Sequence, residues 1–406
     1  MSSGTERAAW RTPLVVLLCG TVVLLLSYGI RTSFGIYLQP MSADLGWGRE
    51  VFALAIAVQN LMWGVAQPIA GAIADRYGAG RVVAVSGAIY VVGLYLASQV
   101  TTQSEFTFSA GILIGSGLSG TAFPVVMAVV ARSVSAKRRS LFLGLGAAGG
   151  SSGQVLVIPL GGIFLDGYGW SIALLMMAVM AITMVPLAVA LAGRPDPAAN
   201  AEAPQGLGEA LREAVSHSGF LYLNAGFFVC GFHVIFIATH LPAFITDKGG
   251  GTALGATALV LIGVGNIVGS YLSGVLGGHF SKKYLLSGLY FARSVVIAIF
   301  ILTPVTDVTI MTFSFSIGVL WLSTVPLTSG LVAQIFGVRY MATLFGVVFF
   351  THQIGSFLGA WLGGYVYDKT GSYDIVWWVA VALGVAAALL HWPINERPVT
   401  RLAAAE

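Results

Sequence analysis

The chain alternates long apolar runs with short polar connections along almost its whole length. Each run supplies the roughly 20 apolar residues that a helix needs to cross the hydrocarbon core of a bilayer. The runs are continuously apolar, which favours helices over the short alternating strands of a membrane barrel. The sequence therefore predicts an all-α membrane protein with twelve transmembrane helices. These are expected near 13–38, 50–74, 81–100, 106–131, 141–165, 170–192, 219–246, 254–277, 284–303, 308–335, 340–366 and 374–392.

The composition supports a membrane protein. The 406 residues are 57% hydrophobic and only 9% charged, whereas an ordinary soluble domain carries about 25% charged residues. The two cysteines, Cys19 and Cys230, fall inside predicted helices and imply no disulfide framework. The sequence contains no phosphate-binding loop, HExxH or CxxC pattern. We therefore expect no enzyme activity, cofactor, metal or nucleic-acid partner, and the lipid bilayer as the surroundings.

Positive charge is distributed unequally between the predicted loops. Of the 20 Lys and Arg residues, 15 fall on the side of both termini, and Arg49, Lys248 and Lys369 fall on the other. Because Lys and Arg accumulate in cytoplasmic loops, both termini are expected in the cytoplasm of a multi-pass protein of the plasma membrane, here a bacterial inner membrane. The remaining two, Arg31 and Arg293, lie within predicted helices, and no acidic residue lies deep in a crossing.

The crossings divide into two similar sets of six. The longest polar segment, 194–218, separates an N-terminal half, 1–193, from a C-terminal half, 219–406. Two parallel six-helix halves, related by an axis along the membrane normal, are one plan of secondary transporters. A sequence shift of 202 residues relates the halves by several matches: Pro124 with Pro326, Lys137 with Arg339, Gly153 with Gly355, and Asp166 with Asp368.

The loop after the second crossing carries a family pattern. Residues 71–81, GAIADRYGAGR, resemble the G-x-x-x-D-R-x-G-R-R/K motif of the major facilitator superfamily. The resemblance implies the major facilitator fold, with two pseudo-symmetric six-helix halves. It also places Asp75, Arg76 and Arg81 at cytoplasmic helix ends, where pairing between helices favours one gate state. The second copy of the motif is degraded, with Gly277 in place of the aspartate.

Within this superfamily, the chain resembles the bacterial monocarboxylate transporter and oxalate–formate antiporter branch. Residues 27–47, SYGIRTSFGIYLQPMSADLGW, are similar to the first helix of that branch and its following loop, and 351–378 are similar to the eleventh helix. The resemblance implies a small organic anion as substrate. The eighth helix departs from it, because related transporters have an arginine four residues after a polar residue, and here Asn266 is followed by Ser270.

Arg31 is the strongest candidate for binding such an anion. An arginine deep in a bilayer costs about 2.5 to 3.5 kcal/mol even by insertion measurements, so it normally faces a cavity or a partner, unless it snorkels to the interface. Its planar fork fits a carboxylate through two parallel hydrogen bonds. The 202-residue shift carries Arg31 onto His233, and the resemblance places the first and seventh helices around a central cavity. We therefore expect Arg31 and His233 to face each other, with Arg31 replacing the arginine that is absent at Ser270.

Other polar and aromatic residues complete the candidate site. His233 and His352 are candidate proton carriers, because histidine titrates near neutral pH. The lone amides, Asn266 and Gln154, either hydrogen-bond neighbouring helices to each other or bind the substrate. The aromatic residues either wall a small site or pack the core. The full substrate-binding set is Arg31, His233, Asn266, His352, Gln154, Tyr28, Trp321 and Phe349.

Together these features predict a secondary active transporter of small organic anions. The first hypothesis is proton-coupled transport of monocarboxylates by alternating access, by a monomer. Two alternatives stay open: an exchanger of dicarboxylates or formate-like anions, and an exporter of amphipathic drugs. A non-transporting membrane sensor on the same fold is a third, disfavoured because the linker and the tails are too short for an output domain.

Overall fold

The computed structural model describes residues 10–47, 49–193 and 205–403, which are helical and contain no strand. The first bundle consists of α1 (Pro13–Leu45), α2 (Arg49–Tyr77), α3 (Ala79–Ala97), α4 (Gln103–Phe106), the π-helix η1 (Thr107–Leu113), α5 (Ile114–Thr121), α6 (Phe123–Ser133), α7 (Ala136–Ile182) and α8 (Met184–Leu187). The connecting helix α9 (Leu207–Ser216) follows. The second bundle consists of α10 (Ser218–Asp247), α11 (Thr252–His279), α12 (Lys282–Leu302), α13 (Asp307–Trp321), α14 (Thr324–Phe336), α15 (Met341–Thr370) and α16 (Asp374–His391), and α17 (Thr400–Ala403) ends the described chain.

The number of crossings agrees with the prediction. Within the described ranges, ten helical stretches are long and apolar enough to span a membrane. One of them, Ala136–Leu187, is 52 residues long and changes direction at Gly169, whose φ of 77° is accessible to glycine, so it supplies two crossings. The 29-residue α2 supplies one more. The twelve-helix membrane fold is therefore confirmed.

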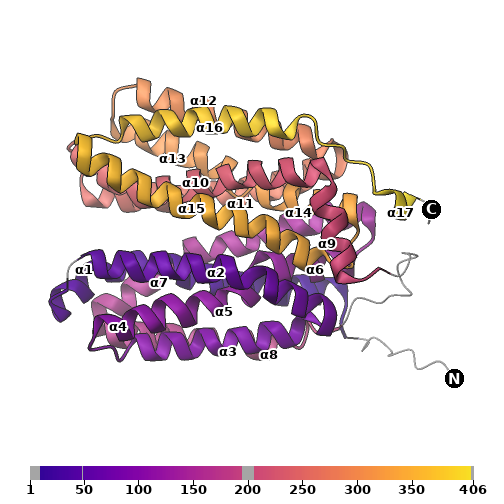
Figure 1. Ribbon diagram of the computed structural model, residues 1–406. Coiled ribbons are helices and arrows are strands. Elements are labelled where there is room, and N and C mark those ends of the chain that lie inside the picture. Colours follow the sequence, from indigo (N-terminus) through magenta and orange to yellow (C-terminus); the bar gives the residue numbers. More distant parts are fainter. Residues whose placement is uncertain (1–9, 48, 194–204, 404–406) are drawn as a thin grey trace.

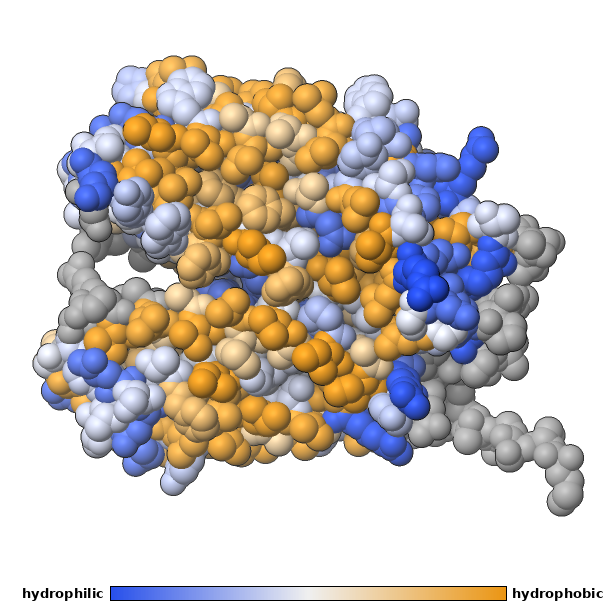
Figure 2. All heavy atoms as spheres, in the orientation of Figure 1, coloured by the Kyte–Doolittle hydropathy of each residue, from blue (hydrophilic) through white to orange (hydrophobic). Residues whose placement is uncertain are grey.

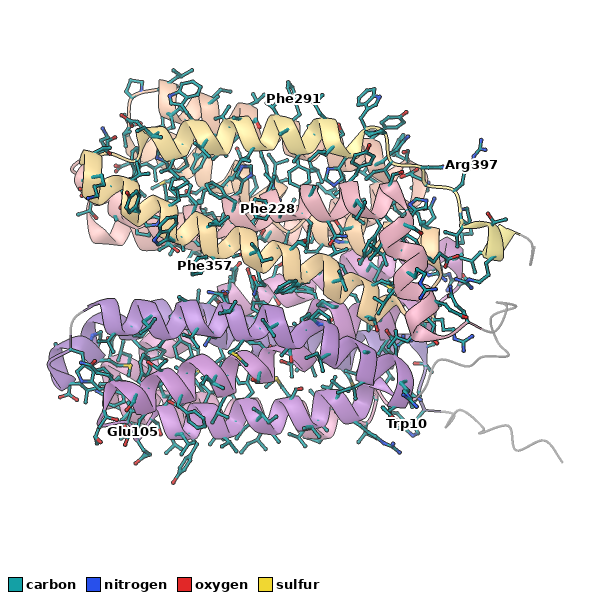
Figure 3. The ribbon with its side chains drawn as sticks, in the orientation of Figure 1. Trp10, Glu105, Phe228, Phe291, Phe357 and Arg397 are labelled. Atoms are coloured by element: carbon teal, nitrogen blue, oxygen red, sulfur yellow. The ribbon has the colours of Figure 1, made fainter. Side chains whose placement is uncertain are left out.

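The helices lie side by side in two bundles with their long axes roughly parallel (Figure 1). Trp10 and Arg397 lie at one end of the molecule, which we call the termini end, and Glu105 lies at the opposite end (Figure 3). Hydrophobic side chains form a broad belt between two polar ends (Figure 2). Phe291, which is 56% exposed, belongs to this belt. An apolar belt with polar ends fits a multi-pass membrane protein.

Glycines related by the 202-residue shift make equivalent contacts. A Cβ atom at Gly153, in α7, would collide with the carbonyl oxygen of Leu25 in α1. A Cβ atom at Gly355, in α15, would collide with the carbonyl oxygen of Phe228 in α10. Small residues allow this close approach of helix backbones in membranes. The division at 194–218 into halves 1–193 and 219–406 stays a prediction that these paired contacts support.

One crossing in each bundle is broken ahead of a proline. In the first bundle, Ala122 has extended dihedrals (φ −87°, ψ 175°) between α5 and α6, two residues before Pro124. In the second bundle, α13 ends at Trp321 and α14 begins at Thr324, two residues before Pro326. The shared break strengthens the correspondence between the bundles.

The break between α13 and α14 is held by Arg293, which is 1% exposed. Its Nε donates to the carbonyl oxygen of Leu320 at 2.9 Å, and its NH2 group donates to the carbonyl oxygens of Leu320 and Trp321. These are carbonyls that the end of α13 leaves without helical partners. No ion pair joins Arg293 to an acidic residue of the described chain. Arg293 therefore braces the broken helix, and backbone oxygens take the place of a carboxylate.

Candidate functional site

Arg31 lies in α1, and its guanidinium is directed at α2, not toward the interface of membrane and water. Its NH2 group donates to Oδ1 of Asn60 at 2.5 Å, and its guanidinium carbon lies 5.0 Å from the centre of the Trp63 ring. Its Nε is buried and has no hydrogen-bond partner in the part of the chain that the structure describes. No ion pair joins Arg31 to an acidic side chain of the described residues. The guanidinium is thus held in place, and its Nε–H group can still donate a hydrogen bond to a ligand.

The Trp63 ring that Arg31 contacts is fixed by a chain of hydrogen bonds. Its Nε1 donates to Oε1 of Gln67 at 3.1 Å, and Nε2 of Gln67 donates to the carbonyl oxygen of Ser119 at 2.7 Å. Asn60, Trp63 and Gln67 recur at helical spacing and share one face of α2. Sequence reasoning missed this face, although two amides at such spacing in an apolar helix were a visible signal.

The site continues from Trp63 into the second bundle. The ring of Trp63 lies 4.8 Å from that of Phe349 in α15. Phe349 is stacked on His352, with 5.1 Å between the ring centres and 11° between the ring planes. We call Arg31, Trp63, Phe349 and His352 the aromatic row. It brings together three residues of the predicted set and connects the two bundles.

The structure does not bring His233 to Arg31, contrary to expectation. The imidazole of His233 is turned toward α16, where its Nε2 lies 2.8 Å from the carbonyl oxygen of Ala380. The space exists because Gly384 has no side chain: a Cβ atom there would lie 3.2 Å from Cε1 of His233. His233 is 1% exposed. In this conformation its imidazole packs inside the second bundle.

The two predicted amides form a separate link between the bundles. Nδ2 of Asn266, in α11, donates to Oε1 of Gln154, in α7, at 3.0 Å. Oδ1 of Asn266 accepts from the backbone N–H of Leu322 at 3.1 Å, at the break between α13 and α14. Ser270, one turn further along α11, is fully buried. In this conformation the amides therefore bind each other across the interface of the bundles.

The remaining aromatic candidates pack against neighbouring rings or helices. Tyr28 meets Phe123 edge-on, with 6.0 Å between the ring centres. Trp321 is 3% exposed and ends α13, where its carbonyl oxygen accepts from Arg293. The core-packing alternative fits both residues in this conformation.

Asp75 joins the two bundles at the termini end. Its Oδ1 accepts from Arg132 at 2.9 Å, and its Oδ2 accepts from the backbone N–H and the hydroxyl of Thr343, at 2.7 and 2.9 Å. Thr343 lies in the first turn of α15, where N–H groups lack helical partners and favour an anion. Arg76 and Arg81 are exposed, and within the described ranges neither makes a hydrogen bond or ion pair to the other bundle. Sequence reasoning missed Arg132 and Thr343, because partners so far apart in the chain carry no local signal.

Backbone contacts close the same end. A Cβ atom at Gly71, in α2, would collide with the carbonyl group of Ala342 in α15. On the other side of the interface, a Cβ atom at Gly144 would lie 2.5 Å from Cα of Gly274, where α7 crosses α11. Figure 2 shows the bundles in contact toward the termini end and separated at the opposite end. The aromatic row is thus closed off from the termini end.

Comparison with known proteins agrees with this architecture. Residues 20–360 match the model of the Major Facilitator Superfamily. The chain is 26% identical to Monocarboxylate transporter 13 of Bos taurus, over 93% of this chain and 89% of that protein. It is 24% identical to the uncharacterized MFS-type transporter YcxA of Bacillus subtilis (strain 168), over 96% of this chain and 97% of that protein.

A solved structure confirms the fold. The proton:xylose symporter XylE, bound to 6-bromo-6-deoxy-D-glucose, is similar with a TM-score of 0.75 and 13% identity, over 97% of this chain and 98% of that one. Likeness at this identity supports the fold alone. Together with the family match over most of the sequence, it shows that the chain belongs to the Major Facilitator Superfamily of membrane transporters.

Proposed function

We propose that the protein carries small monocarboxylates across the membrane by alternating access, coupled to protons. The observation that carries this proposal is Arg31: a guanidinium between helices, held by an amide and an indole face, with a buried Nε that no described residue accepts from. A carboxylate supplies both the charge and the two acceptors that such a fork binds. Several related proteins are named as monocarboxylate transporters, which supports the same substrate class.

Alternating access requires two gate states, and one end is closed here. Asp75 and the glycine contacts hold the termini end together, while the bundles are separated at the other end. We place both termini in the cytoplasm of a bacterial inner membrane, because 15 of the 20 basic residues lie on their side. The conformation is then outward-facing, and the protein is taken to act as a monomer whose halves 1–193 and 219–406 rock against each other.

For the proton carrier we propose His352, not His233. His352 ends the aromatic row, and its Nδ1 lies 3.2 Å from Oε1 of Gln353 and 3.4 Å from the hydroxyl of Ser356. Cys230 and the rings of Phe227 and Phe349 also adjoin it. A carboxylate bound at Arg31 would neutralise the positive charge on the same row and so favour a proton on His352. Binding of anion and proton would then promote each other, as symport requires.

The His352→Gln variant is expected to lose proton-driven accumulation. We expect at least a tenfold decrease in uptake of a small monocarboxylate into proteoliposomes under an imposed pH gradient, with exchange at equal pH largely kept. This magnitude corresponds to about 1.4 kcal/mol of lost coupling. His233→Gln is the matched control, and it should behave like the wild type.

Two results would change this assignment. Loss of coupling in His233→Gln, but not in His352→Gln, would return the role to His233. A wild-type protein that ignores the pH gradient would rule out symport and leave the exchange of anions, including dicarboxylates and formate.

A further inference from the structure

Cys230, in α10, is surrounded by side chains that can donate hydrogen bonds. It is 1% exposed. The NH1 group of Arg293, in α12, donates to its Sγ at 3.4 Å, and the hydroxyl of Thr324, in α14, lies at the same distance from Sγ. The imidazole of His352, in α15, also makes a hydrogen-bond contact with the sulfur. Three helices thus bring donors to one buried sulfur atom.

These surroundings favour the thiolate over the thiol. A neighbouring guanidinium and the N-terminus of a helix both stabilise a cysteine thiolate, and Thr324 is the first residue of α14. The hydroxyl of Tyr290, in α12, faces the sulfur and is buried with no hydrogen bond of normal geometry to a described residue, so it is a further donor. Tyr28 of α1 faces the sulfur as well, and phenols are neutral at physiological pH.

The charge of Arg293 also calls for a thiolate at this position. Its other hydrogen bonds go to the carbonyl oxygens of Leu320 and Trp321, which are not ionised, and no ion pair joins it to an acidic residue of the described chain. A proton on His352 would add a second positive charge beside the same sulfur. Because like charges at short range disfavour each other, a negative charge on Cys230 would make that proton easier to bind.

We propose that Cys230 supplies the negative charge of the second bundle, as a thiolate that pairs with Arg293 and favours a proton on His352. The inference rests on the proposed function, in which His352 carries the coupled proton. Cys230 is a positioning residue, because it acts on the imidazole through its charge. During the cycle only an N–H bond of His352 forms and breaks, its proton is exchanged with water, and the sulfur stays ionised.

The first test measures the ionisation of the sulfur by nuclear magnetic resonance. The chain contains two cysteines, so the full-length Cys19→Ser protein, isotopically labelled at Cβ of cysteine, gives one signal from Cys230. We expect the chemical shift of a thiolate at about pH 7, where an ordinary thiol, which titrates at about pH 8.5, is protonated. Cys19, which is only partly buried in α1, is the matched control, and its signal in Cys230→Ser should be that of a thiol.

The second test removes the charge and then restores it. Cys230→Ser keeps a side chain of similar size and removes the charge. We expect its uptake of a small monocarboxylate into proteoliposomes under a pH gradient to fall at least about tenfold more than its exchange at equal pH. Cys230→Asp returns a negative charge to Arg293 and should recover gradient-driven uptake to within about threefold of the wild type. Cys19→Ser should transport like the wild type.

The outcomes distinguish this inference from the function on which it rests. A thiol signal from Cys230, or Cys230→Ser protein that accumulates substrate like the wild type, would overturn the inference while proton-coupled transport stands. A folded Cys230→Asp protein that transports no better than Cys230→Ser would also refute the role of the charge. If the wild type ignores the pH gradient although Cys230 gives a thiolate signal, the proposed coupling is wrong and the pair of Cys230 and Arg293 stands.

Discussion

Replacing Arg31 with alanine is expected to abolish binding of small carboxylates while the protein still folds. A hydrogen bond to a charged group contributes about 1.5–3 kcal/mol, so losing two of them should raise Kd by at least about 100-fold. The fold should survive, because the side chain is held by one hydrogen bond to Asn60 and by the face of Trp63. No carboxylate of the described chain is left unpaired by the change.

Titration of the purified variant with the wild-type substrate tests this expectation, beside thermal unfolding to confirm the fold. Arg31→Lys serves as the graded variant, because it keeps the charge and loses the planar fork. We expect it to retain part of the affinity. Normal affinity in a well-folded Arg31→Ala protein would exclude Arg31 as the anion site.

Replacing Asp75 with asparagine is expected to open the termini end. The change removes the charge that pairs with Arg132 and that lies at the start of α15. A hydrogen bond to a charged group contributes about 1.5–3 kcal/mol. Asp75 and Arg132 both belong to the first bundle, whereas Thr343 belongs to the second, so only the two hydrogen bonds to Thr343 join the bundles. Weakening these two bonds raises the free energy of the closed conformation and shifts the population toward opening.

The shift is measured by labelling a cysteine at position 140 with a maleimide in detergent solution, in a background without Cys19 and Cys230. Ser140 is 6% exposed and lies where α7 meets α11, with its hydroxyl 2.7 Å from a Cβ atom built on Gly277. We expect labelling at least tenfold faster in Asp75→Asn, equivalent to about 1.4 kcal/mol. Arg76→Gln is the matched control, because Arg76 is exposed. Equal rates in Asp75→Asn and the wild type would count against a gating role.

The sequence predicted the crossings well because lipid imposes one dominant requirement on every helix, an apolar run of fixed length. It also identified Asp75, since the motif around it is local. The partners Arg132 and Thr343 lie 57 and 268 residues away in the chain, and only the packing of α2, α6 and α15 brings them to Asp75. A one-dimensional pattern does not contain that information.

The symmetry argument failed at His233 for a physical reason that the sequence already contained. Arg31 is held by Asn60 and Trp63. The 202-residue shift carries those two positions onto Ile262 and Gly265, which offer neither an acceptor nor an indole face. The second bundle therefore lacks the surroundings that hold Arg31, and His233 turns to a carbonyl oxygen of α16 instead. The two bundles thus share a backbone arrangement, but the side chains around Arg31 and around His233 differ.

Arg293 also has a consequence for how the protein is made. Its acceptors, the carbonyl oxygens of Leu320 and Trp321, come 27 and 28 residues later in the chain. At a synthesis rate of about 5–20 residues per second, they emerge roughly 1 to 6 s after Arg293. During that interval α12 carries a guanidinium whose insertion alone costs about 2.5 to 3.5 kcal/mol. We therefore expect α12 to enter the membrane together with α13, because the carbonyl oxygens at the end of α13 offset that cost.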